Sequence, residues 1–143
     1  MPLEMIIFTG LQGSGKSTYY REHFADTHAL VSKDLLRNNS RPERRQRQLI
    51  EEHFRHGRSV VVDNTNASPD DRAPLIELAR NHGARVIAIY FDVPVKTCLE
   101  RNDAREGKAC VPHVGIFATL KRMKRPELAE GFDEVRVVEQ KDH

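Results

Sequence analysis

The sequence predicts an α/β fold in which helices cover a parallel β-sheet. Short apolar runs alternate with helical patterns along almost the whole of the 143 residues, as expected for parallel strands joined by crossover helices. Residues 59–63 are nearly all β-branched, which is typical of a strand covered on both faces. A chain of this length can bury most of the surface that its unfolded form exposes. We therefore expect residues 1–143 to form a single domain.

The first two strands are expected to flank a glycine-rich loop and a helix. The apolar run at residues 5–9 predicts the first strand, and the helix is expected from Lys16 to about Phe24. The run at residues 29–32 predicts the second strand, and a short helix is expected to begin near Asp34. Both strands lead into polar segments at the ends where sheets of this type bind ligands.

The middle of the chain carries clear helix signals. Residues 42–56 place Ile50 and Phe54 on one side, and Gly57 follows directly. This pattern predicts an amphipathic helix with a glycine stop. The strand at residues 59–63 comes next and is expected to be central in the sheet.

The following helix is predicted from its ends. Ser68 can cap its amino terminus, Pro69 suits its first position, and Gly83 follows its last turn. Residues 85–93 form a further apolar run and predict another buried strand.

The carboxyl-terminal third contains two helix starts, a charged interruption and a last strand. Helices are expected to open at Pro94 and at Pro112, with the charged, glycine-containing stretch 102–111 between them. Residues 135–138 predict the strand that closes the sheet. Four or five parallel strands flanked by helices are therefore expected.

The glycine-rich loop GLQGSGKST, residues 10–18, matches the phosphate-binding pattern G-x-x-x-x-G-K-[ST]. Its glycines let the backbone turn amide groups inward, and the positive end of the following helix favours an anionic di- or triphosphate. Lys16 is expected to reach the terminal phosphates, and the Ser17 hydroxyl to bind Mg²⁺. The strand before the loop and the helix after it favour a P-loop fold over a structural turn. The expected nucleotide-binding residues are Gly13, Ser14, Gly15, Lys16, Ser17 and Thr18.

Asp63 ends the strand at residues 59–63 and is a second candidate metal ligand. An acid at the tip of a strand beside a phosphate loop helps to hold Mg²⁺ in P-loop enzymes. The segment Asp-Asn-Thr-Asn that starts at Asp63 is equally compatible with a turn in which side chains satisfy the backbone. Both interpretations stay open at this stage.

Phosphoryl transfer also requires a base and positive groups for the moving phosphoryl. Asp34 and Arg37 lie one helical turn apart after the second strand, so both side chains could face one cleft. The stretch 101–112 carries Arg101, Arg105 and Lys108 and is typical of a lid over a triphosphate. The alternatives are an ordinary helix start at Asp34 and a solvated charged loop.

These motifs together resemble the kinase domain of the polynucleotide 5′-hydroxyl kinases, the viral and eukaryotic end-healing enzymes. The resemblance covers nearly the whole chain and adds a lid pattern R-N-x-x-R-x-x-K-x-x-P and a closing pattern P-x-x-x-E-G-F. The matching positions are residues 10–18, Asp34 and Arg37, residues 63–66, then Arg101, Asn102, Arg105, Lys108 and Pro112, and finally Pro126, Glu130, Gly131 and Phe132.

The resemblance implies an ATP-dependent kinase that acts on 5′-hydroxyl ends of DNA or RNA. It implies that Asp34 is the general base, that Arg37 contacts the acceptor phosphate, and that Arg105 binds the ATP phosphates. Lys16, Ser17 and Thr18 would hold phosphate and Mg²⁺.

The chain departs from the family in two respects. Asn64 stands where some members have Asp, so the partner of the acceptor arginine is open and Asp63 is one candidate. The phosphatase motif D-x-D-x-T is absent from the sequence, so a kinase module alone is expected.

Composition sets the wider expectations. The net charge is +2, yet residues 41–58 carry six Arg against three Glu, and residues 101–125 carry seven basic against two acidic residues. Such segments can neutralise nucleic-acid phosphates, although they also occur on ordinary soluble domains. Two widely spaced cysteines and the lack of a long apolar run favour a reduced, cytoplasmic protein without a membrane segment. No protein partner is predicted.

Two other functions remain open from the sequence. A kinase for a small molecule such as a nucleoside, sugar or antibiotic would use the same Lys16 and Asp34 with a closed acceptor pocket. A nucleotide-dependent binding module would bind ATP without transfer, and Asp34 would then be dispensable.

Overall fold

Five parallel strands form one sheet in the order β2-β3-β1-β4-β5. The computed structural model describes residues 2–36, 39–105 and 110–139, and every expected strand is present within them. The strands are β1 (Glu4–Thr9), β2 (His28–Val31), β3 (Ser59–Asp63), β4 (Arg85–Asp92) and β5 (Glu134–Glu139). The α/β class with a parallel sheet is therefore confirmed, with five strands rather than four.

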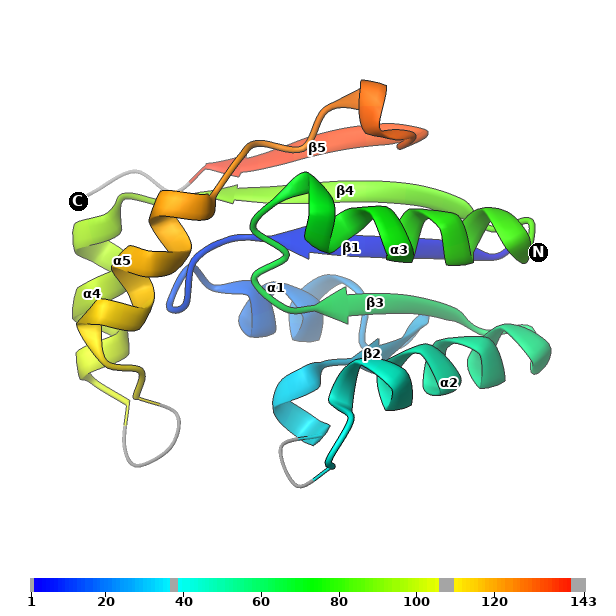
Figure 1. Ribbon diagram of the computed structural model, residues 1–143, viewed down its shortest axis with the longest axis horizontal. Coiled ribbons are helices and arrows are strands. Elements are labelled where there is room, and N and C mark those ends of the chain that lie inside the picture. Colours follow the sequence, from blue (N-terminus) through cyan, green and yellow to red (C-terminus); the bar gives the residue numbers. More distant parts are fainter. Residues whose placement is uncertain (1, 37–38, 106–109, 140–143) are drawn as a thin grey trace.

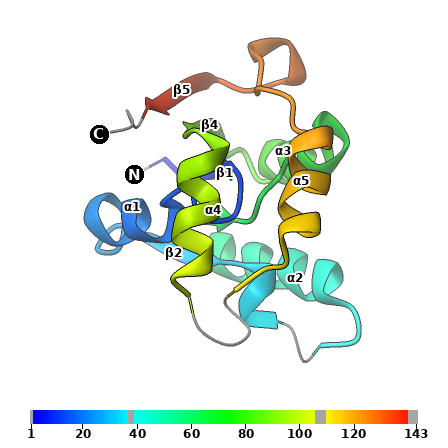
Figure 2. The same cartoon turned by 90° about the vertical axis from the view of Figure 1, so that its left-hand side faces the viewer.

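Helices lie on both faces of this sheet (Figures 1 and 2). They are α1 (Lys16–His23), α2 (Pro42–Arg55), α3 (Pro69–Asn81), α4 (Val95–Asp103) and α5 (His113–Arg122), with short 3-10 helices η1 (Lys33–Leu36) and η3 (Leu128–Glu130). The short helix expected near Asp34 is η1. No helix in the part of the chain that the structure describes is both long and apolar enough to cross a membrane.

The central strand β1 separates two apolar cores. Met5 and Ile7 point into a core completed by α2 and α3, whereas Ile6 and Phe8 point into a second core completed by α1 and by Cys98 of α4. All four β1 side chains are essentially inaccessible to water, as alternation along a strand covered on both faces requires. Burial of each such side chain contributes about 1.5–3 kcal/mol, so β1 is firmly held.

The start of α3 shows the expected capping chemistry. The Ser68 hydroxyl accepts a hydrogen bond from the Asp71 amide at 3.3 Å, and the Asp71 carboxylate accepts one from the Ser68 amide at 3.3 Å. Pro69 occupies the first turn, where its missing amide proton costs nothing. The helix end before Gly83 is also confirmed.

The strands end at one edge of the sheet, and α4 and α5 lie beyond that edge (Figures 1 and 2). Because all five strands are parallel, the segments that follow β1, β2 and β3 meet there. This geometry brings the phosphate loop, η1 and the loop after β3 together.

The helix α4 extends further than the sequence pattern predicts. It continues to Asp103, so Arg101 and Asn102 lie in a helix and not in the charged excursion. The physical reason is that the Asn102 side chain is fully buried and pairs with the backbone of Val111, donating to its carbonyl at 2.6 Å and accepting from its amide at 2.8 Å. Lys108, assigned to the same stretch, lies outside the described residues.

Candidate active site

A cleft of about 720 Å³ opens at the carboxyl ends of the strands. Most of its lining comes from the phosphate loop, the end of β2 with η1, and the loop after β3, and single residues of α2, α3 and α5 complete it together with Arg105 and Val111. Positive and negative side chains both lie on these walls. The charged residues that line it are Lys16, Lys33, Asp34, Glu43, Asp63, Asp71, Arg105 and Arg122.

The phosphate loop needs glycine at two positions. Gly13 and Gly15 have φ angles of 82° and 94°, in the left-handed region that residues with a Cβ rarely adopt. A Cβ on Gly13 would also lie 2.5 Å from the Cys98 carbonyl oxygen. The loop is anchored to its neighbour by a 3.1 Å hydrogen bond from the Gly10 amide to the Thr65 carbonyl.

Lys16 directs its ammonium group into this loop. The Nζ atom donates to the carbonyl oxygens of Gly10 at 3.0 Å and Leu11 at 2.8 Å. Burial lowers the pKa of Lys16 from 10.5 to about 8, although the nearby Asp63 carboxylate opposes the shift. Charge on Lys16 is therefore expensive without an anion, which favours the binding of phosphate there.

Ser17 and Asp63, the two residues expected to bind Mg²⁺, lie beside each other. The Ser17 hydroxyl donates to the Asp63 carboxylate at 3.1 Å. Burial raises the pKa of Asp63, and the charge of Lys16 partly offsets the rise. One hydroxyl and one carboxylate beside a phosphate loop suit Mg²⁺, which takes few protein ligands and completes its shell with water and phosphate oxygens. The residues therefore fit a nucleotide-bound magnesium ion.

Ser14 supplies a second observation that fits an anion. Its hydroxyl oxygen is buried and has no hydrogen-bond partner among the residues that the structure describes. A buried hydroxyl without a partner is unfavourable, whereas the same group can donate to a phosphate oxygen. Elsewhere in the described residues, His, Cys, Asp and Glu form no cluster of three or more that could hold a metal ion.

Asp34 lies in η1 and lines the main cleft together with the phosphate loop. Its amide donates to the Ser32 hydroxyl at 3.2 Å, which shapes the turn after β2. Its charge contributes to the pKa values of both Lys16 and Asp63, which indicates that the three groups are near one another. Arg37, predicted as the partner in acceptor binding, lies outside the described residues.

Asn64 has a role that sequence reasoning did not identify. Its Oδ1 accepts from the Lys33 amide at 2.8 Å, and its Nδ2 donates to the buried Gln46 side chain of α2 at 2.7 Å. Asn64 thus ties the start of η1 to α2. The pairing with Gln46 could not be found from the sequence, because nothing in an amphipathic helix pattern marks one glutamine as a tertiary partner.

Arg105 lines the main cleft and also a second one of about 380 Å³. The second cleft adjoins the phosphate loop on the side of α1 and β5. It is lined by residues that include Thr18, Tyr19, Arg101 and Val138. Arg105 therefore lies where a nucleotide bound in the loop and a ligand in the main cleft would meet.

Arg122 and Asp71 also line the main cleft and were not among the predicted site residues. Arg122 ends α5 and pairs with the Asp71 carboxylate at 3.3 Å, with both side chains about half exposed. Basic residues at the end of a helix are ordinary, so only the packing of α5 beside α3 reveals this pair.

A family model described as an AAA domain matches residues 5–126 of the chain. The chain belongs to this AAA domain family. The match includes the phosphate loop, η1, the loop after β3 and α5. It therefore covers every wall of the main cleft.

Three curated proteins are similar to this AAA domain. Two carry the name bifunctional polynucleotide phosphatase/kinase. The one from Acanthamoeba polyphaga mimivirus is 28% identical over 94% of this chain and 33% of its own length, and the one from Schizosaccharomyces pombe is 24% identical over the same shares. An L-seryl-tRNA(Sec) kinase of Methanococcus maripaludis is 28% identical over 90% of this chain and 56% of its own length. The chain thus spans between one third and about half of these relatives.

Solved structures agree on the fold. A sugar kinase from Janibacter has a TM-score of 0.71 at 18% identity, covering 96% of this chain and 86% of its own. The Chaetomium thermophilum protein Kti12, solved with ADP-AlF3, has a TM-score of 0.71 at 19% identity, covering 97% and 90%. The P-loop kinase fold expected from the sequence is therefore confirmed.

Proposed function

We propose that the protein is a kinase that transfers the γ-phosphate of ATP to a 5′-hydroxyl end of DNA or RNA. The observation that carries the proposal is that Lys16, Asp34 and Arg105 line the same cleft. A cation for the donor phosphates, a carboxylate for the acceptor and a second cation are the protein groups that phosphoryl transfer needs. The two polynucleotide phosphatase/kinases among its relatives support the choice of acceptor.

The donor half of the site would be the phosphate loop. The backbone amides of Gly13 and Gly15, the Ser14 hydroxyl and the Lys16 ammonium would bind the phosphates, with Thr18 at the start of α1. Ser17 and Asp63 would hold Mg²⁺, which when bound neutralises charge on the phosphates. The second cleft, beside Thr18 and Tyr19, offers space for the rest of the nucleotide.

The acceptor half would be the wall formed by η1 and α5. Asp34 would accept the proton of the acceptor hydroxyl while that oxygen forms its bond to the γ-phosphorus and the bond to the ADP oxygen breaks. Arg105 would meet the charge that develops on the transferred group. Arg37 and Arg122 would contact the phosphate that follows the acceptor sugar.

A transfer assay tests the proposal and separates it from the alternatives. The protein is incubated with Mg²⁺, γ-labelled ATP and either 5′-hydroxyl oligonucleotides, nucleosides or water alone. Label on oligonucleotides is expected. Label only on small molecules would make the protein a small-molecule kinase, and phosphate release without an acceptor product would favour a binding module.

Replacement of the base gives a sharper test. Asp34→Ala is expected to lower kcat by about 10²-fold or more while ATP affinity stays within about twofold, because Asp34 contacts the acceptor and not the donor. Glu43→Ala is the matched control, since Glu43 also lines the cleft but is largely exposed. Full activity of Asp34→Ala would show that the base is another group.

A kinase for a hydroxyl on a smaller acceptor is a second candidate. The walls of the cleft carry four carboxylates, Asp34, Glu43, Asp63 and Asp71, which balance its four cations. The cleft thus has no excess positive charge for a polynucleotide backbone, and it offers hydrogen-bonding groups to a neutral polar acceptor. The similarity to an L-seryl-tRNA(Sec) kinase adds seryl-tRNA, itself a polynucleotide, as a further acceptor to be tested. The same assay, with nucleosides and seryl-tRNA added, distinguishes the two candidates.

A further inference from the structure

Arg72 is a fully buried arginine that none of the transfer chemistry uses. Its side chain is inaccessible to water and belongs to α3, behind the cleft wall. Both edges of the guanidinium are occupied. Nε and Nη2 donate to the two carboxylate oxygens of Glu130 at 2.8 and 3.0 Å, and Nη1 donates to the carbonyls of Asn66 at 2.8 Å and Lys124 at 3.1 Å.

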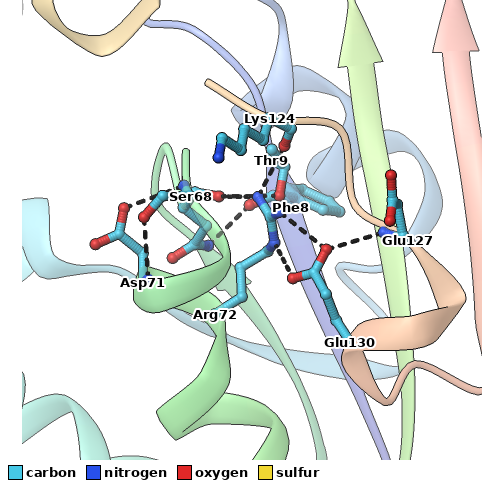
Figure 3. A network of polar contacts seen from close by, with 9 residues as sticks. Phe8, Thr9, Ser68, Asp71, Arg72, Lys124, Glu127 and Glu130 are labelled. Atoms are coloured by element: carbon cyan, nitrogen blue, oxygen red, sulfur yellow. Dashed lines mark hydrogen bonds and ion pairs between the residues drawn. The ribbon is translucent and has the colours of Figure 1, made fainter. Parts of the chain in front are cut away.

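Figure 3 shows this arrangement from close by, with the Arg72 side chain between Glu130 and Lys124. Asn66 and Lys124 belong to different segments. Asn66 lines the cleft, and Lys124 lies two residues after Arg122, which also lines it. The guanidinium is therefore a bridge between two walls, because its fixed planar shape sets the distance between the groups that it binds.

The first segment is the loop after β3. Asn66 has a left-handed φ of 42°, and its Nδ2 donates to the Phe8 carbonyl of β1 at 2.8 Å. The preceding residue, Thr65, accepts the hydrogen bond from Gly10 that anchors the phosphate loop. Arg72, together with the Thr9 hydroxyl, which donates to the same Asn66 carbonyl at 3.3 Å, thus also holds the loop that carries Asp63 and Asn64.

The second segment follows α5. The Lys124 amide donates to the Ala67 carbonyl at 2.8 Å, so this segment lies directly against the loop after β3. Two residues earlier, Arg122 lines the cleft and pairs with Asp71. The position of Lys124 therefore sets where the last turn of α5 presents Arg122.

The carboxylate of Glu130 neutralises the buried charge of Arg72. A buried arginine without a counter-charge is strongly unfavourable, and Glu130 supplies that charge from η3, 58 residues further along the chain. The same carboxylate accepts a hydrogen bond from the Glu127 amide at 2.9 Å. The closing motif that contains Glu130 thus has a physical task, although it lies outside the cleft.

We propose that Arg72, neutralised by Glu130, is a positioning residue that holds the loop after β3 and the end of α5 in register as the two walls of the acceptor side. This inference rests on the proposed kinase function for its catalytic consequence. It assigns to Arg72 the alignment of the acceptor with the donor phosphates, and it leaves nucleotide binding to the phosphate loop.

The test is the double variant Arg72→Met with Glu130→Gln. Both buried charges disappear together, so the fold is kept, and the glutamine oxygen can still accept from Glu127. The links to Asn66 and Lys124 are lost. We expect kcat/KM for the acceptor to fall roughly ten- to a hundredfold, since small misplacements in transfer sites have effects of this size. ATP affinity is expected to fall much less at a temperature far below unfolding, because Lys16 keeps its own contacts with Gly10 and Leu11.

Arg80→Met is the matched control. Arg80 lies on the same helix and also binds the carboxyl-terminal region, pairing with Asp133 at 3.3 Å and donating to the Gly131 carbonyl. These partners lie outside the loop after β3 and the segment after α5, the two segments that Arg72 links. This variant is expected to keep wild-type transfer. A double variant with wild-type transfer and wild-type acceptor KM would overturn the inference.

Amide hydrogen exchange tests the inference without any acceptor substrate. The amides of Gly10 and Lys124 are expected to exchange several-fold faster in the double variant and at the wild-type rate in Arg80→Met, because both donate to the segments that Arg72 holds. Unchanged protection of these amides would overturn the inference. A wild-type protein that phosphorylates none of the acceptors would overturn the proposed function instead, and the exchange result would then decide the inference alone.

Discussion

At the scale of single residues, the main cleft brings charges of both signs close together where water is partly excluded. The Lys16 ammonium is held by two backbone carbonyls, and Asp63 is held by the Ser17 hydroxyl. Burial opposes the charge on both groups, which lowers the pKa of Lys16 and raises that of Asp63. Each charge becomes favourable when an anion or a cation binds beside it, so ligand binding and protonation are coupled.

This coupling predicts how nucleotide binding depends on pH. With a pKa of about 8, Lys16 is mostly protonated at pH 7 and mostly neutral at pH 9. A bound phosphate stabilises the protonated form and raises the pKa, so binding takes up a proton above pH 8. The dissociation constant for ADP without divalent metal is therefore expected to be flat below pH 7 and to rise by up to about tenfold per pH unit above pH 8.

Isothermal titration calorimetry in two buffers of different ionisation enthalpy measures both the affinity and the proton uptake. Lys16→Arg is the control, because an arginine stays protonated throughout this range and should abolish the pH dependence. An equal ADP affinity at pH 7 and pH 9.5 in the wild-type protein would contradict the assignment of a lowered pKa to Lys16.

At the scale of elements, the connection between α4 and α5 depends on the buried side-chain amide of Asn102. Asn102 binds both the amide and the carbonyl of Val111, so the ends of the charged stretch are held together independently of the stretch itself. Arg101 and Arg105 are thereby presented from the end of a helix, and Arg101 reaches the Gly13 carbonyl at 3.4 Å.

Removal of the Asn102 side-chain amide is expected to destabilise the connection between α4 and α5. Asn102→Ala deprives two partly buried backbone groups of their partners, which should lower the free energy of unfolding by about 1–3 kcal/mol. Cleavage by trypsin after Arg105 should become several-fold faster. Asp103→Asn is the control, since it alters only the exposed pair with His113. Equal cleavage rates for Asn102→Ala and the wild-type protein would show that Asn102 does not stabilise this connection.

At the scale of the whole molecule, the carboxyl-terminal region is attached to the rest through Arg72 and through β5 at the edge of the sheet. The strand β5 pairs with β4 alone, and several of its side chains are exposed. The buried ion pair with Glu130 is one attachment among several, which include the Arg80–Asp133 pair and the buried side chain of Phe132. Its contribution can be measured separately from its proposed role in positioning.

Stability measurements on single and double variants make this separation. Glu130→Gln alone leaves the Arg72 charge buried without a counter-charge and is expected to cost about 3–5 kcal/mol of unfolding free energy. Addition of Arg72→Met should recover most of that loss, because no buried charge remains. Urea denaturation monitored by circular dichroism gives both values, and a double variant less stable than Glu130→Gln would contradict this account.

Local patterns in the sequence are sufficient to predict the class of fold and the position of the phosphate loop. Apolar periodicity and helix ends are local properties, so the five strands, the cap at Ser68 and the glycines at positions 13 and 15 could be predicted from neighbouring residues. Asp34 and Asp63 could be placed at one edge because parallel strands end together, whereas Arg105 was expected near them only as part of a lid. Their proposed roles in transfer are not decided by that placement.

Which distant residues hold together the segments at the carboxyl ends of the strands is seen only in the folded chain. The pairing of Asn64 with Gln46, of Asn102 with Val111 and of Arg72 with Glu130 depends on side chains that meet after the sheet has formed. The family patterns include Asn102 and Glu130, but no local pattern names the partner of either residue or of Asn64. The lowered pKa of Lys16 has the same origin, because burial is a property of the folded chain and not of the motif.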